Sequence, residues 1–153
     1  MTPDQLLSDI GERLADEIEI ALGPWVVKSI TTVFEAWHGE MTSTAAADAA
    51  AAAAAVTDDL MPRLRQLLAA DVDDQWTNPL QLIRGSVSHV TDALSRLGVG
   101  EVVRDDFAER TAPSDVYGLE PARFSDVDAS LHEIGLAWGA VKAKAHFARR
   151  RAE

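Results

Sequence analysis

The chain has 153 residues, no cysteine and a formal net charge of −11. This length fits one domain with a core of its own. The lack of cysteine excludes disulfides, thiolate metal sites and a cysteine nucleophile, and it fits a reducing compartment such as the cytoplasm. The acidic charge makes nucleic-acid binding by the body of the protein unfavourable, because an acidic surface repels phosphates.

Hydropathy predicts no membrane span, because no stretch of about 18 residues is apolar and free of charge. The segment Met1–Gln5 lacks the basic start of a secretory signal. Residues 1–75 hold 14 acidic side chains against 4 Lys and Arg, and residues 76–153 hold 11 against 10. This split either favours a basic partner or marks a solvated acidic face.

Residues 1–40 predict a helical hairpin. Thr2, Pro3 and Gln5 form a capping box with proline at the first helical position. Apolar residues then recur at helical spacing, and Gly23-Pro24 predicts the end of this helix near residue 22 and the start of a second over 24–38.

Residues 41–75 are rich in alanine. Ser43 or Thr44 can cap a helix over Ala45–Ala70, since alanine has the best helix propensity. Alanine buries little area, so the alternative is a partly ordered spacer. We expect a break or a kink near Asp58–Pro62, because proline disfavours the helix interior.

Residues 76–153 form a helical second half. Asn78-Pro79 predicts a helix start and Gly98 a helix end. Between them apolar residues recur at spacings of three and four: Leu80, Ile83, Val87, Val90, Leu94 and Leu97. This face belongs either to a bundle or to a seam for a partner. A short helix over Arg104–Arg110 and a loop over Thr111–Pro121 follow.

The last helix is expected over residues 126–150, with one apolar stripe: Leu131, Ile134, Trp138, Val141 and Ala145. Gly135 and Gly139 each cost about 1 kcal/mol against alanine, so a close helix backbone or a ligand should offset them. The fold class is therefore all-α, a single-domain bundle of about five to six helices with a long C-terminal helix and no sheet.

The last helix also carries the candidate ligand-binding residues. One face of this helix is small in the middle and basic toward the end, and it carries His132, Gly135, Gly139, Lys142 and His146. Trp138 can line an adjacent cavity. A carboxylate or phosphate ligand fits such a groove, but the more common cause of this pattern is tight helix–helix packing, with Lys142 and His146 reaching solvent.

Asp128 and His132 are four residues apart and can pair as a general base, or Asp128 can simply cap the helix. Phosphate-binding loops, dinucleotide fingerprints and nucleophile elbows are absent from the sequence. We therefore assign no catalytic residue and no cofactor.

Glu35 and His38 form a Glu-x-x-His unit, the spacing found in di-metal helical bundles. Such a centre needs a second unit, which the sequence lacks and which a homodimer would supply. His38 at a helix end is also favoured by the helix dipole alone.

Basic residues close the chain: Lys142, Lys144, Arg149, Arg150 and Arg151. They complement the end of a helix dipole. The tail can contact RNA, anionic lipid, an acidic protein or the acidic first half of a second copy, or it can be a solvated end.

Trp76–Leu80, Arg104–Phe107, Asp115–Tyr117 and Leu131–Gly139 resemble segments of an uncharacterised family of actinobacterial proteins. The resemblance covers the second half and implies no activity. Two functions remain. The first is a cytoplasmic protein-interaction module that associates with itself or with another protein, and the second is a small-molecule or metal-binding protein with its site near His132, Gly135 and Gly139.

Overall fold

The computed structural model describes residues 2–69, 78–100 and 117–152. They contain α1 (Pro3–His38), α2 (Ser43–Leu68), α3 (Pro79–Gly85), α4 (Val87–Arg96), α5 (Phe124–Val127) and α6 (Leu131–Ala152). These residues include no strand, which confirms the all-α bundle with a long C-terminal helix. The expected helix over Arg104–Arg110 lies outside them. No helix in the described ranges has the length and apolar character needed to cross a membrane.

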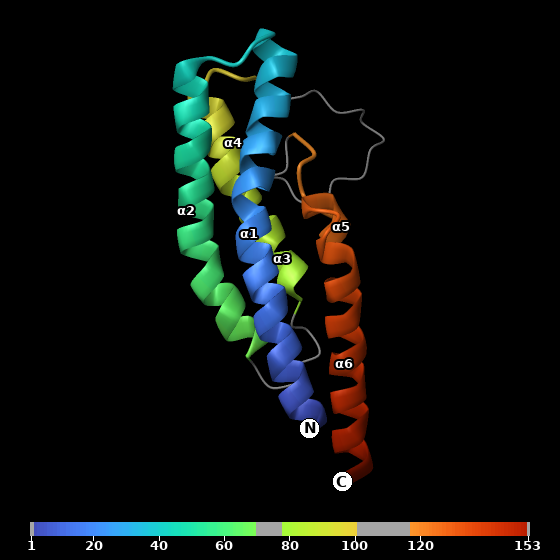
Figure 1. Cartoon of the computed structure of the whole chain (residues 1–153). Helices are drawn as coiled ribbons and strands as arrows, with labels where there is room; N and C mark the ends of the chain where they lie inside the picture. The colour runs from blue at the N-terminus through green and yellow to red at the C-terminus, as the bar shows by residue number, and fades with distance from the viewer. Residues whose placement is uncertain (1, 70–77, 101–116, 153) are drawn as a thin grey trace.

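Helix α1 is the centre of the bundle. It packs against α2, α4, α5 and α6, with α2 and α6 on either side of it in Figure 1. Helix α6 runs antiparallel to α1, so both chain ends lie at the same end of the bundle. The substantial packing partners of α6 among the described elements are α1 and α5. One face of α6 therefore has no neighbour in these parts of the chain.

The predicted break at Gly23-Pro24 is wrong, because α1 continues from Pro3 to His38. Pro24 removes the hydrogen bond to the Ile20 carbonyl, but both residues lie on the exposed face, where water can satisfy that oxygen. Gly23 also lacks the Cβ that would clash with the proline ring. The predicted hairpin within residues 1–40 is one helix, and the true antiparallel hairpin is formed by α1 and α2.

The ends of α1 agree with the sequence. The Gln5 backbone N–H donates to the Thr2 hydroxyl at 3.2 Å, and the Gln5 side chain accepts from the Thr2 N–H at 3.0 Å. Gly39 ends the helix at φ +94°. This positive φ favours glycine, since other residues are strained there.

The alanine-rich segment is a helix, not a spacer. Thr42 caps it, one residue before the expected caps, by accepting from the Ala45 N–H at 3.0 Å. Four alanines are buried in the core: Ala45, Ala49, Ala52 and Ala53. Their small side chains let α2 approach its neighbours closely. Pro62 stands inside α2 on its exposed side, and the ribbon bends in that half without a break (Figure 1).

The single helix expected over Pro79–Leu97 is divided at Ser86 into α3 and α4. The buried Ser86 hydroxyl donates to the Ile83 carbonyl and so competes with the helical backbone. The periodic apolar face points inward, with Ile83, Val90 and Leu94 fully buried. It therefore serves the bundle core, and the alternative of a partner seam along this face is wrong.

Candidate functional site

Helix α6 begins later than the sequence predicts, because Asp128 separates it from the short α5. The Asp128 carboxylate accepts from the Ser130 backbone N–H at 2.9 Å, and this hydrogen bond lowers the pKa of Asp128 below its usual value. His132 is exposed and makes no ion pair with Asp128. Asp128 thus orders the turn before α6, as in the capping alternative.

The two glycines of α6 have different surroundings. A Cβ on Gly135 would stand 2.4 Å from Cδ2 of Phe124, so glycine is required for the packing of α5 on α6. A Cβ on Gly139 would meet nothing within 4 Å, and this residue is exposed. The expected close approach occurs at Gly135 alone, and the neighbour is an aromatic ring and not a helix backbone.

Trp138 lies on the buried side of α6. Its side chain is 9% exposed, and the indole Nε1 has no hydrogen-bond partner among the residues that the structure describes. This nitrogen lies 4.0 Å from the position that a Cβ on Gly11 of α1 would take. The Lys142 ammonium stands 5.2 Å from the centre of the Trp138 ring, a cation–π contact.

The candidate ligand-binding residues are therefore divided between two faces. Gly135 and Trp138 are buried, His132 and Gly139 are exposed, and Lys142 is half-buried. None of the five lines the pocket described below. That pocket therefore does not gather them, and a ligand there stays a prediction.

Glu35 and His38 lie exposed near the end of α1. The His38 ring packs on Phe34 with 4.6 Å between ring centroids, and its Nε2 lies 3.3 Å from the Leu97 carbonyl oxygen. Within the described ranges, no three His, Asp or Glu side chains gather as metal ligands would. A metal at this unit needs ligands beyond the described residues and stays a prediction.

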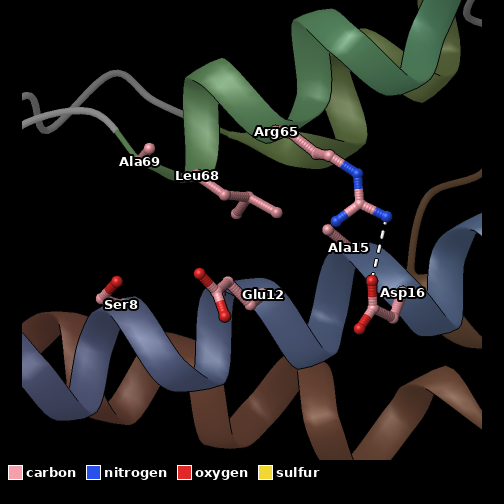
Figure 2. Close-up of a pocket in the computed structure, with 8 residues that line it drawn as sticks. Ser8, Glu12, Ala15, Asp16, Arg65, Leu68 and Ala69 are labelled. Carbon is pink, nitrogen blue, oxygen red and sulfur yellow. Dashed lines mark hydrogen bonds and ion pairs between the residues drawn. The ribbon is translucent and has the colours of Figure 1, made fainter.

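Sequence reasoning missed a pocket of about 250 Å³ between α1 and the C-terminal end of α2 (Figure 2). Its lining comprises Ser8, Gly11, Glu12, Ala15, Asp16, Arg65, Leu68 and Ala69. Arg65 donates to Asp16 at 2.9 Å and to Glu19 at 3.2 Å, and chiefly the Asp16 hydrogen bond raises the pKa of the guanidinium. Because these ion pairs are exposed, they contribute modestly to stability.

Sequence reasoning also missed the outer face of α6, which we define by Leu136, Ala140, Ala143 and Phe147. Leu136 is 63% exposed and Phe147 is 60% exposed, although both are large and apolar. Ala140 and Ala143 between them are also exposed. The signal was available as a second stripe at helical spacing, opposite the stripe that begins at Leu131.

The basic tail lies in the last turns of α6. Arg149 reaches Asp4 of α1 at 3.5 Å, which ties the end of α6 to the beginning of α1. Arg150 and Arg151 are exposed. Of the three arginines in the tail, Arg149 is bound to the bundle and the other two point to solvent.

No protein-family model, curated protein or solved structure matches this chain. The resemblance of the second half to actinobacterial proteins therefore stays a prediction. Any statement about function has to come from the residues and surfaces described above.

Proposed function

We propose that this protein is a protein-interaction module whose contact surface is the outer face of α6. The observation that carries the proposal is the exposure of Leu136 and Phe147, at 63% and 60%, on one stripe of a helix that is otherwise anchored in the bundle. Exposure of a continuous apolar stripe to water is unfavourable, and the free energy falls when another protein covers it.

The position of the stripe supports this proposal. Helix α6 packs on α1 and α5 through its opposite face, where Leu131 and Ala145 are fully buried, so the outer face is presented on a supported helix. Other exposed apolar side chains include Ile20 and Trp37 on α1. Exposed apolar residues that stand singly are ordinary on protein surfaces.

The charge of the chain restricts the partner. The net charge of −11 opposes a nucleic-acid partner for the body of the protein, and the cations of the tail are few. The outer face of α6 fits a protein partner that has an apolar strip on its surface. A cytoplasmic site of action accords with the lack of cysteine.

Native mass spectrometry of the purified full chain tests the proposal. We expect species heavier than the 16.5 kDa of one chain, and we expect their loss in the variant Leu136→Ser/Phe147→Ser. Ile20→Ser is the matched control, because Ile20 is 77% exposed but lies on α1. Bound mass that persists in the α6 variant would refute the outer face as the contact surface.

A further inference from the structure

Resting on the proposed function, we infer that the partner of the outer face of α6 is the same face of a second copy, docked antiparallel about a two-fold axis that passes between Val141 and Lys142. The first argument is spacing. Leu136, Ala140, Ala143 and Phe147 follow each other at intervals of four, three and four, which read the same in both directions. An antiparallel two-fold pair therefore superimposes the stripe on itself.

In this register the large side chains meet at the ends and the small ones in the middle. Leu136 faces the partner's Phe147, and Ala140 faces the partner's Ala143. Alanine at the centre allows the two helix axes to approach to about 8 Å, the short end of the usual range. Leu136 and Phe147 then fill the widening space on either side of the axis.

Charge supports the same arrangement. Glu133 precedes Leu136 by three residues and Arg150 follows Phe147 by three, so both extend the stripe along the same face. Both are exposed, and neither has an ion-pair partner within the described residues. The antiparallel axis places Glu133 opposite the partner's Arg150, twice in the dimer.

A parallel pair would instead place each Arg150 beside the partner's Arg150 and each Glu133 beside the partner's Glu133. Like charges in contact oppose association, so charge selects the antiparallel arrangement. A surface that is self-complementary in both spacing and charge is what an isologous two-fold interface requires.

The arrangement also separates the two Glu35–His38 units. The contacts of Trp138 with Gly11 and of Arg149 with Asp4 place the axis beside the first turns of α1. His38 lies about 27 residues after Gly11 in the same helix, which is about 40 Å at a rise of 1.5 Å per residue. The antiparallel axis sends the partner's His38 in the opposite direction, so this dimer does not assemble a shared metal centre.

A charge-swap experiment tests the register. Glu133→Arg and Arg150→Glu are made singly and together in the full chain, and dimer dissociation is measured by sedimentation over a concentration series. Each single reversal weakens the dimer about 3- to 10-fold, because two pairs become repulsive. The double variant recovers the wild-type constant to within about twofold, since the pairs are restored with exchanged signs. The differences shrink at high salt.

Cross-linking gives a second readout, made clean by the absence of native cysteine. Leu136→Cys mixed with Phe147→Cys forms a disulfide-linked heterodimer under mild oxidation, because these positions face each other. Each variant alone cross-links poorly, since its two copies lie 11 residues, about 16 Å, apart along the axis and Cα atoms beyond about 7 Å are not bridged. Ile20→Cys is the control on α1.

The outcomes separate the two proposals. In one outcome Leu136→Ser/Phe147→Ser abolishes association, but the double charge swap does not restore it and the mixed cross-link does not form. This result overturns the antiparallel register and leaves the outer face as the contact surface. Association that survives this variant overturns both. A wild-type chain that sediments as a monomer at every concentration overturns the second copy as the partner.

Discussion

The inner and outer faces of α6 differ in what their apolar side chains do, although both belong to one helix of 22 residues. On the inner face Leu131 and Ala145 are 0% and 1% exposed, and Trp138 is 9% exposed. On the outer face Leu136 and Phe147 remain mostly exposed. The inner side chains hold α6 to the bundle, and the outer ones make no comparable contact within the described chain.

The two faces of α6 therefore depend on different processes. Folding of one chain covers the inner face, so substitutions there should reduce stability at any protein concentration. The described residues leave the outer face uncovered, and the proposed association would cover it, so substitutions there should act through the concentration-dependent part of stability.

Leu131→Ala should have the largest effect. Leu131 is fully buried at the start of α6, and removing its side chain leaves a cavity that costs about 2–5 kcal/mol of unfolding free energy. Leu136→Ala, the matched control on the outer face, should change stability by less than about 0.5 kcal/mol in dilute protein. Urea unfolding at low concentration measures both, and equal losses would contradict the division of α6 into two faces.

Gly135→Ala comes next. The added Cβ would stand 2.4 Å from the Phe124 ring, so this ring or α5 must move, and we expect a loss of about 1–3 kcal/mol. Gly139→Ala is the control: its Cβ meets nothing within 4 Å, and it should gain up to about 1 kcal/mol from helix propensity. Thermal unfolding of dilute protein compares them, and a loss in both would reveal an unrecognised contact at Gly139.

The sequence was sufficient where local chemistry and periodicity agreed. The capping box of Thr2 and Gln5, the stop at Gly98 and the inward stripe of α6 all form as predicted. Each depends on residues within one or two helical turns. Local rules are reliable for such features because no distant neighbour has to be known.

The sequence was insufficient where the outcome depended on which face met solvent. Gly23-Pro24 ends many helices, but here Pro24 lies on the outside of a long helix, and packing on both sides holds it together. Ser86 divides a periodic helix by a hydrogen bond that the apolar pattern does not show. Among site residues, the contact of Phe124 with Gly135 joins two segments whose approach no spacing rule predicts.

The outer face of α6 was overlooked for a related reason. A helix with two opposite apolar stripes is ambiguous until the core is known, and the stripe containing Trp138 was the more conspicuous. Once α1 is seen to cover that stripe, Leu136 and Phe147 become apolar residues without a partner in the chain's described parts.

Gly11→Ala should raise stability slightly, whereas Gly135→Ala should lower it. Gly11 lies where α1 meets Leu68 and the inner-face residue Trp138, and a Cβ there would stand 3.4 Å from the Leu68 carbonyl oxygen, an ordinary contact. We therefore expect a gain of up to about 1 kcal/mol, because alanine replaces glycine inside a helix. Chemical unfolding measures it. A clear loss would show that the inner face of α6 and the pocket beside Gly11 tolerate no added atom.

Asp128→Asn should have the smallest effect, and only at some pH values. Because the pKa of Asp128 is lowered in the folded state, its stabilising contribution is present above the unfolded value and is lost as the pH falls through the folded one. Asparagine keeps an acceptor for the Ser130 N–H but no charge. The variant should therefore be slightly less stable than wild type above about pH 4 and equal to it at lower pH. Thermal unfolding across this range measures the difference, which salt should reduce because Asp128 is exposed. A difference that is independent of pH would assign the role of Asp128 at the start of α6 to the shape of its side chain and not to its charge.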